Sequence, residues 1–389
     1  MDYLTLLLLP FGVVIGWLLG QWPGNRKAAA LPSLSNQYFR GLNYLINEEQ
    51  DKAINIFTKI LEDNPETVDT HISLGSLFRR RGETARAISI HENLMNHSNL
   101  SNEQRLAAQM ELGRDYMRAG LLDRAEVPFR ELSNLPDYQL NALRFLNEIY
   151  DQEHDWDRAI EIAKNLKDLD PDSGWNIVIA HYYCEKADLA LRNNEDQLVE
   201  TYLQKSLDQF SGCVRANIIW ARLFEKRSEF AEAVNKYKMV EHQNPSFLPE
   251  VVPRLVSAYE KIAEADEIID FLQDLAAKHS STTVLLTLVK KTNEQYGEQK
   301  AEKILLNSLQ SKPSVQGLEY LISLTLGRIK NSDDKSILLG LQRMMLQLRE
   351  EKSLYKCKVC GFQARQPHWQ CPGCRNWGSI NPTVGVYGE

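Results

Sequence analysis

The sequence predicts an all-α protein: a solenoid of helical repeats that carries an apolar N-terminal segment and a small cysteine-rich tail. Three observations predict this. A charge-free apolar run fills the N-terminus, one residue pattern recurs about every 34 residues, and four of the six cysteines fall near the C-terminus. At 389 residues the chain has room for two or three domains. The predicted segments are 1–24 (transmembrane anchor), 25–34 (linker), 35–349 (about eight to nine repeats) and 350–389 (metal-binding module).

The composition excludes several classes of protein. The chain has 45 Lys and Arg against 52 Asp and Glu, so its net charge of −7 argues against a general nucleic-acid binder. With 43% hydrophobic and 25% charged residues it is not a disordered chain. Twenty glycines and 14 prolines are too few for collagen-like or low-complexity sequence, and six cysteines are too few for a disulfide-framed secreted scaffold.

The first element is the apolar run between Tyr3 and Asn25, which contains no charged side chain. About 20 helical residues cross the hydrocarbon core of a bilayer, so this run predicts a single transmembrane helix. The basic pair Arg26-Lys27 follows the run, which by the positive-inside rule places the rest of the chain on the cytoplasmic side. The alternative is a cleaved signal peptide, for which Ala28–Ala30 resembles a cleavage site, but no basic residue precedes the run. A periplasmic repeat protein would need the reverse topology.

The body repeats one pattern. Its first copy, residues 35–68, contains Tyr44, Ala53, Phe57 and Pro65 at fixed offsets. Successive alanine-equivalent positions are separated by 34, 38, 34, 40, 34, 35 and 33 residues, which is the period of tetratricopeptide repeats. A plain helical bundle would not keep these spacings. The equivalent positions are Ala53, Ala87, Ala125, Ala159, Val199, Ala233, Ile268 and Ala301.

Residue types within the repeat have mechanical reasons. We expect glycines of each first helix to allow close contact with the second helix, and glycines in the turn to take positive φ. Prolines are expected to end second helices, because proline cannot continue a helix. The two long spacings predict longer connections near residues 97–103 and 188–194, and an amphipathic end-cap helix is expected around residues 338–348. The glycines expected in first helices are Gly41, Gly75 and Gly113, and those expected in turns are Gly82 and Gly120. The prolines expected to end second helices are Pro65, Pro171, Pro245 and Pro313.

The tail contains two C-x2-C pairs separated by ten residues: Cys357 and Cys360, then Cys371 and Cys374. Two such pairs supply four thiolates to one tetrahedral ion, so they predict a metal site in preference to two disulfides. Zinc and iron both accept four sulfur ligands, so the ligand type does not separate them. Gly361 is expected to permit the turn that directs backbone N–H groups at sulfur.

The size and charge of the tail support a fold that depends on metal. Residues 352–389 contain five Lys or Arg and one acidic residue, and the positive charge offsets that of four thiolates. A module of this size cannot fold on apolar burial alone, so metal binding is expected to stabilise it. We expect its aromatic residues to wrap the site and exclude water: Tyr355, Phe362, Trp369 and Trp377.

Other candidate chemistry is weak, and we predict a protein that is not an enzyme, with no catalytic or cofactor-binding residues. His91 and His97 lie six residues apart and are interpreted as surface residues, while His181 and Cys184 are interpreted as packed or groove-lining. Cys213 has no obvious partner. The run Arg79–Arg81 ends a helix, with a partner-binding patch as the alternative. No phosphate-binding loop, dinucleotide fingerprint or zinc-protease motif is present.

The order of anchor, repeats and four-cysteine tail resembles the lipopolysaccharide assembly protein B family (LapB, also called YciM) of Gram-negative bacteria. The resemblance covers essentially the whole chain. Its tail is rubredoxin-like, although the ten-residue gap is shorter than in true rubredoxins, which weakens an electron-transfer interpretation. The stretches that carry it are DKAINIFTKILEDNPETVDTHISLGSLFRRRGE, RAISIHENLM, QRLAAQMELGRDYMRAGLLDRAE and YKCKVCGF…HWQCPGCRNW.

The resemblance implies an inner-membrane protein, facing the cytoplasm, that sets lipopolysaccharide output. Its implied partners are a membrane-anchored AAA protease, the deacetylase that commits precursors to lipid A, and lipopolysaccharide assembly proteins. The four cysteines match the family's metal ligands, for one iron or zinc ion. We therefore expect a non-catalytic adaptor or scaffold. The alternative is a metal- or redox-sensing protein that uses the four-cysteine site.

Overall fold

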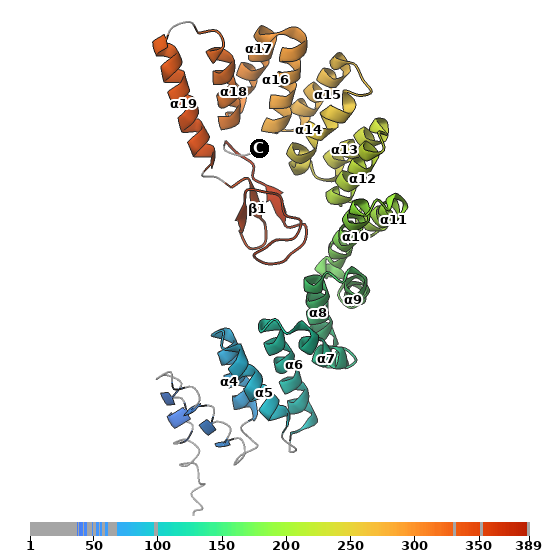
Figure 1. Cartoon of the computed structure of the whole chain (residues 1–389), viewed down its shortest axis with the longest axis vertical. Coiled ribbons are helices and arrows are strands. Elements are labelled where there is room, and N and C mark those ends of the chain that lie inside the picture. Colours follow the sequence, from blue (N-terminus) through green and yellow to red (C-terminus); the bar gives the residue numbers. More distant parts are fainter. Residues whose placement is uncertain are drawn as a thin grey trace, which may run out of the picture. The chain divides into compact units, whose positions relative to one another are not determined.

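The computed structural model describes residues 68–96, 100–329, 332–350 and 353–386, with isolated positions between 37 and 60. Helices fill this part of the chain up to residue 350, and a small β-module follows them (Figure 1). No helix within these residues has the length and apolar character to cross a membrane. The predicted anchor, residues 1–24, lies outside the described residues. The chain divides into two compact units, residues 1–142 and 143–389, with the boundary inside one helix.

The first unit is built from helix pairs in the predicted register. Its helices are α4 (Val68–Arg80), α5 (Thr84–Met95), α6 (Asn102–Arg118), α7 (Leu122–Leu132) and the start of α8 (Pro136–Glu153). A Cβ on Gly75 would lie 2.4 Å from the His91 ring, and one on Gly113 would lie 2.7 Å from the Phe129 ring. The predicted close contact between paired helices is therefore confirmed at both glycines.

One sequence interpretation in this unit is wrong, and another is correct but incomplete. His91 is fully buried rather than exposed, and its Nδ1 lies 2.5 Å from Oδ2 of the buried Asp115. Arg79 lies in the last turn of α4, as predicted, and its guanidinium also donates to Asp115 (2.8 Å) and Glu111 (2.5 Å) on α6. Although burial alone would raise the pKa of Glu111, hydrogen bonds from Arg79, Arg114 and Ser76 lower it to about 2. Pairing of these carboxylates with Arg79 offsets the free-energy cost of removing the charges from water.

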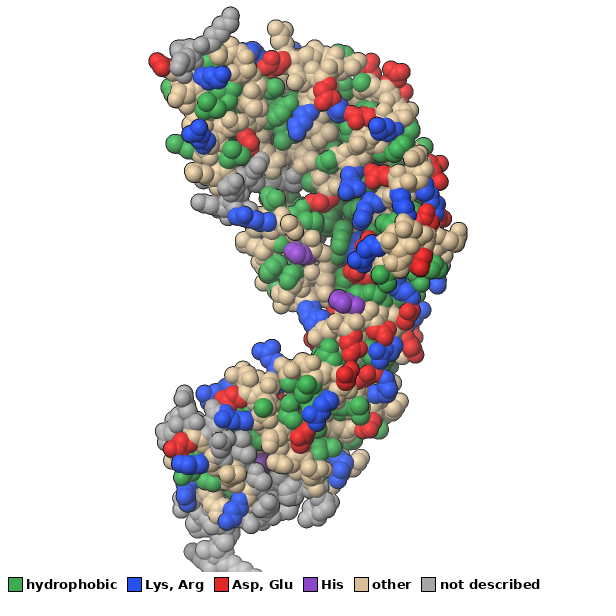
Figure 2. Space-filling model, in the orientation of Figure 1, with side chains coloured by type: hydrophobic (Ala, Val, Ile, Leu, Met, Phe, Trp, Pro, Cys, Tyr) green, Lys and Arg blue, Asp and Glu red, His purple; other side chains and the backbone are tan. Residues whose placement is uncertain are grey.

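The second unit continues the array from the remainder of α8. Within the described residues, the helices α4–α19 form eight successive pairs, of which the even-numbered helix is the first member. Acidic and basic side chains are interspersed over α10–α13 (Figure 2). The helices are α9 (Trp156–Leu169), α10 (Trp175–Arg192), α11 (Asp196–Gln209), α12 (Val214–Lys226), α13 (Phe230–Gln243), α14 (Leu248–Tyr259), α15 (Ala265–Lys278), α16 (Thr282–Tyr296), α17 (Glu298–Ser311), α18 (Val315–Leu326) and α19 (Ser332–Glu350), with 3-10 turns η2 (Pro171–Ser173) and η3 (Pro245–Phe247).

Turn chemistry is largely as predicted. Pro171 and Pro245 begin the 3-10 turns that follow α9 and α13, and Pro313 follows α17, so all three lie just after second helices. Gly82 and Gly120 take positive φ (85° and 75°) in the turns within a pair. In later pairs the same left-handed position is occupied by His154, Asn194 and Ser228. Asparagine and histidine adopt this conformation more often than most residues, whereas serine is less expected there.

The long spacing before Val199 has a different cause from the predicted one. The residues near 188–194 do not form a longer connection, because α10 continues to Arg192 and the turn to α11 spans only residues 193–195. The preceding repeat keeps the 34-residue spacing with an equally long α8 (18 residues, as in α10). Compared with that repeat, the extra length is distributed over α9 and the connections on either side of α10. Of the other predicted insertion, residues 97–99 lie outside the described residues.

The core of the second unit is a series of apolar clusters between helices. One cluster spans α12–α16 and includes Tyr237, Val251 and Leu272, each fully buried. Another joins α10, α11 and α12 and includes Cys184 and Cys213, whose sulfur atoms lie 3.7 Å apart. Cys213 thus has a neighbour that sequence spacing did not indicate. Burial of such surfaces is the main favourable term in folding.

The β-module, residues 353–386, is called the ribbon below. It contains β1 (Tyr355–Cys357), β2 (Gln363–Ala364) and β3 (Ile380–Pro382) in the order β2-β1-β3. Both pairings are antiparallel, with Tyr355 opposite Ala364 on one side and Pro382 on the other. The ribbon lies on the inner side of the arc formed by the helices of the second unit (Figure 1).

Candidate metal centre

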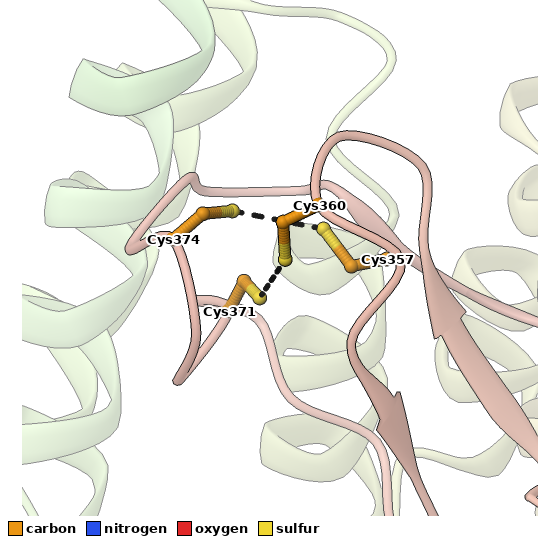
Figure 3. Close-up of side chains that lie close together, drawn as sticks. All are labelled: Cys357, Cys360, Cys371 and Cys374. Atoms are coloured by element: carbon orange, nitrogen blue, oxygen red, sulfur yellow. Dashed lines mark hydrogen bonds between the residues drawn. The ribbon is translucent and has the colours of Figure 1, made fainter.

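Four cysteines of the ribbon converge on one point (Figure 3). Cys357 ends β1 and Cys360 lies in the turn between β1 and β2, while Cys371 and Cys374 lie on the loop that leads to β3. Gly361 takes φ of 78°, so the predicted role of this glycine in the first turn is confirmed. We call these four residues the cysteine cluster.

The cluster has the dimensions of a tetrahedral metal site. Sγ atoms of Cys357 and Cys374 lie 3.7 Å apart, those of Cys360 and Cys371 lie 3.6 Å apart, and all four lie within 4.8 Å of one another. A tetrahedron with metal–sulfur bonds of about 2.3 Å has edges of about 3.8 Å. The donor set therefore fits one ion, and iron and zinc remain equally compatible with it.

Backbone and side-chain groups surround the sulfur atoms with hydrogen-bond donors. Burial opposes the thiolate form of Cys357, but hydrogen bonding with Ser379 and with the N–H groups of Cys360 and Val359 outweighs it and lowers the pKa to about 6. For Cys374, burial is likewise outweighed by Asn376, whose Nδ2 lies 3.4 Å from Sγ, so its pKa is also lowered.

Cys360 behaves differently from these two thiols. The Phe362 N–H favours its thiolate, yet burial and the three neighbouring sulfurs outweigh that bond and raise the pKa to about 12. The cluster therefore holds some of its thiols ready to ionise but opposes ionisation of all four. A bound cation would remove this opposition, and its binding would release protons.

The aromatic residues of the ribbon divide into two groups. Tyr355 and Phe362 pack around the cysteine cluster, as predicted. Trp369 and Trp377 do not wrap the metal site, and that prediction is wrong. Instead, Trp377 stacks on His181 of α10 and Trp369 stacks on Phe247 of η3.

Both tryptophans lie against His181 of α10. The ring centroid of Trp377 lies 5.3 Å from that of His181, with the rings stacked, and the ring centroid of Trp369 lies 6.0 Å from it. Trp369 also stacks on Phe247 of η3 at 5.4 Å. Gly378 (φ 62°) approaches His181 so closely that a Cβ there would lie 3.0 Å from Nε2. The prediction that His181 is a packed or groove-lining residue is confirmed.

Polar contacts reinforce the same interface. Gln370 donates to Asp151 of α8 at 2.6 Å, and Arg375 contacts the same carboxylate at 3.2 Å. The hydroxyl of Tyr355 donates to Glu250 of α14. Near the end of the ribbon, the N–H of Val315 donates to the carbonyl of Val386 at 3.0 Å. The ribbon is thus bound to α8, α10, α14 and α18, all first helices of their pairs.

Sequence reasoning missed this interface. The signal was present in part, because two tryptophans are more than a small metal module needs, and α10 carries a run of aromatic residues, His181, Tyr182 and Tyr183. No spacing rule connects residues about 190 positions apart, however, so their pairing could not be read from the chain.

Two family models match parts of the chain. Residues 355–382 match a rubredoxin metal binding domain, and residues 70–105 match a tetratricopeptide repeat. Among solved structures, the crystal structure of the MamA protein aligns with a TM-score of 0.33 and 18% identity, covering 47% of this chain and 95% of that one.

Two curated relatives match almost the full length. Lipopolysaccharide assembly protein B of Escherichia coli (strain K12) is 34% identical over 386 residues, covering 99% of each chain. The protein of the same name from Haemophilus influenzae is 31% identical over 391 residues, covering 98% of each chain. The match therefore extends over the repeats and the ribbon together.

Proposed function

This chain belongs to the lipopolysaccharide assembly protein B family, and from that premise we propose that it is a membrane-anchored, non-catalytic adaptor that regulates lipopolysaccharide synthesis. One observation carries the proposal: the first helices of the second unit and the ribbon bound to them form a single composite surface. Repeat solenoids use such surfaces to bind other proteins. The relatives are named as assembly proteins, which agrees with an adaptor.

The proposed partners are those that the family implies. The chain would present the deacetylase that commits precursors to lipid A to a membrane-anchored AAA protease, and would gather lipopolysaccharide assembly proteins at the inner membrane. The apolar run in residues 1–24 supports this arrangement, with the body on the cytoplasmic side. An anchor confines the solenoid to the membrane where these partners reside, which raises their effective concentration.

The metal has a structural part in this proposal. Cys357, Cys360, Cys371 and Cys374 would hold one iron or zinc ion, which would fix the fold of the ribbon. A folded ribbon can then present Trp369 and Trp377 to the helices at the same time. The sulfur–sulfur distances and this aromatic contact support the assignment.

Affinity purification of the full chain from detergent-solubilised membranes, with mass spectrometry of bound proteins, tests the adaptor function. Recovery of the protease together with the deacetylase is the expected result. Recovery of assembly proteins without the protease would contradict the proteolytic half of the proposal, and recovery of an electron-transfer partner instead would contradict all of it.

A matched pair of variants tests the metal site in the same experiment. Cys371→Ser removes one proposed ligand, and Cys213→Ser makes the same change at a buried cysteine outside the site. We expect Cys371→Ser to lose metal and partners while Cys213→Ser keeps both. A metal-free Cys371→Ser variant that still regulates lipopolysaccharide normally would show that the ribbon is dispensable.

One observation favours a second function, metal or redox sensing. Cys374 is partly exposed and its pKa is lowered, so a small oxidant can reach a thiol of the cysteine cluster that ionises readily. Metal analysis and redox titration of the purified protein separate the two functions. Iron that cycles reversibly supports sensing, whereas stably bound zinc supports the structural role.

A further inference from the structure

A polar cavity of about 260 Å³ lies in the second unit between α8, α10 and the ribbon. This volume is below the roughly 300–1,000 Å³ of pockets for drug-sized ligands, so the cavity suits a short segment or small polar group. Its relevant lining residues are Arg144, Asn147 and Asp151 of α8, Trp175 and Tyr182 of α10, and Trp377 of the ribbon.

Four buried polar atoms at this cavity have no hydrogen-bond partner among the described residues. Two are acceptors, Oδ1 of Asn147 and Oδ1 of Asp151, and two are donors, the indole Nε1 atoms of Trp175 and Trp377. Asn147 is 7% exposed and Asp151 is 6% exposed. Buried polar groups are almost always hydrogen-bonded, so four orphan atoms around one cavity indicate a missing partner.

The remaining atoms of the two acceptor residues are already engaged, which fixes the side chains. Asn147 donates from Nδ2 to the Tyr182 hydroxyl at 2.9 Å. Oδ2 of Asp151 accepts from Gln370 and from Arg375. These bonds hold both side chains in place, which lowers the entropic cost of recognition.

The charges at the cavity indicate a neutral ligand. Both guanidinium groups at the cavity are already ion-paired: Arg144 with Asp170 at 2.8 Å, and Arg375 with Asp151 at 3.2 Å and Glu148 at 3.9 Å. Neither guanidinium is free to bind a simple anion, and a simple cation would meet the two indole N–H donors. A neutral group that offers donors and acceptors together matches the four orphan atoms, and the peptide unit is such a group.

We propose that this cavity binds an extended peptide segment of a partner protein. Asn147 and Asp151 accept from its N–H groups, while Trp175 and Trp377 donate to its carbonyl oxygens. The site lies between two successive first helices, on the face that repeat solenoids use for binding. Trp377 belongs to the ribbon, so the site is complete only when the ribbon is docked. This inference rests on the proposed adaptor function and names one place where a partner is held.

The test follows the indole N–H signals of the full chain in detergent by nuclear magnetic resonance, assigned with single Trp→Phe variants. The probes are capped tetra-alanine, acetate and methylammonium. We expect capped tetra-alanine to shift the signals of Trp175 and Trp377. Trp220 of α12 also has a buried, unpartnered indole nitrogen but lies outside the cavity, so its signal should not move.

Variants then test the contacts. Trp175→Phe and Asn147→Leu are expected to weaken capped-peptide binding at least tenfold, whereas Trp220→Phe is the matched control and should bind normally. Trp175→Phe is the milder change, and the wild-type titration does not depend on either variant folding.

Two results would overturn the inference. If no probe moves Trp175 or Trp377, the cavity holds water only; if acetate or methylammonium moves them and the peptide does not, it is an ion site. Failure here is distinct from failure of the adaptor function. Partners recovered from membranes by a protein whose cavity binds no peptide would leave the adaptor intact, whereas peptide binding without recovered partners would contradict the adaptor.

Discussion

The helices of the second unit and the ribbon share one interface but are held together by different means. The helices bury continuous apolar clusters, such as the one that contains Val251 and Leu272. The buried members of the ribbon core are Tyr355, Ile380 and two of the cysteines, Cys357 and Cys371. Half of the buried ribbon core thus consists of proposed metal ligands, so apolar burial that suffices for the helices does not suffice for the ribbon.

The ribbon also directs aromatic surface outward. Trp369 packs against the apolar cluster of the helices, and Trp377 contacts Trp156, His181 and Tyr182. Its stability therefore depends on two things outside its own core, the metal and the helices. The helices bury their own apolar clusters and depend much less on the metal or on the ribbon. This difference can be tested by damaging the ribbon or by damaging the helices.

Metal removal should have the largest effect. Chelation or Cys371→Ser is expected to unfold the ribbon, because metal supplies roughly 10–16 kcal/mol in small zinc modules. Far-ultraviolet circular dichroism should show that the helices remain, while limited proteolysis cuts within residues 353–386. A metal-free ribbon that stays protease-resistant would mean that docking alone holds it.

A substitution in the core of the helices should destabilise the helices first and the ribbon as a consequence. Leu272 is fully buried, so Leu272→Ala is expected to cost about 2–5 kcal/mol in the free energy of unfolding of the second unit. The ribbon should be destabilised with it, because Trp369 packs on the same cluster. Denaturant titration measures the loss. The matched control Leu306→Ala, at a leucine that is 39% exposed, should stay within about 0.5 kcal/mol.

Acid should weaken the interface through His181. Burial, with a smaller contribution from Arg215, lowers the pKa of His181 to about 3, against about 6.5 in the unfolded chain. The neutral form is thus favoured in the folded state. Its stabilisation is fully present above pH 6.5 and is lost as pH falls toward 3, by about 1.4 kcal/mol per pH unit.

The pH effect is measured by denaturant titration at pH 7 and pH 5.5, with metal content checked at both. We expect His181→Gln to show a smaller difference between the two pH values than the wild type. Equal differences in the two proteins would show that His181 does not titrate with unfolding, and that another group sets the pH dependence.

The smallest predicted effect concerns one hydrogen bond between the ribbon and the helices. Tyr355→Phe removes the hydroxyl that donates to Glu250 of α14 and leaves the ring on the cysteine cluster. The expected cost is about 1 kcal/mol, seen as a lower denaturant midpoint with unchanged slope. Metal affinity should not change, because the ring still covers the site. A large loss of metal affinity would contradict this prediction and would show that the Tyr355 hydroxyl helps to hold the metal site.

Local features were predictable because they depend on residues close together in the chain. The repeat period, the glycines that face His91 and Phe129, and the prolines after second helices follow from helix geometry. Cys357, Cys360, Cys371 and Cys374 could be grouped from their spacing, and the structure brings their sulfur atoms together. The extra residues before Val199 were misplaced, because a spacing cannot say whether it lengthens a helix or a connection.

The sequence by itself determined the helical repeat array and the four-sulfur cluster, since both depend on short, periodic spacings that leave few alternatives. Only the tertiary structure decided that Arg79 and His91 share the buried Asp115, that Trp369 and Trp377 both lie against His181, and that Asn147 and Asp151 leave two oxygens unpaired at one cavity. These contacts join residues distant in sequence. The burial and charge pairing that select them exist only after the helices have stacked.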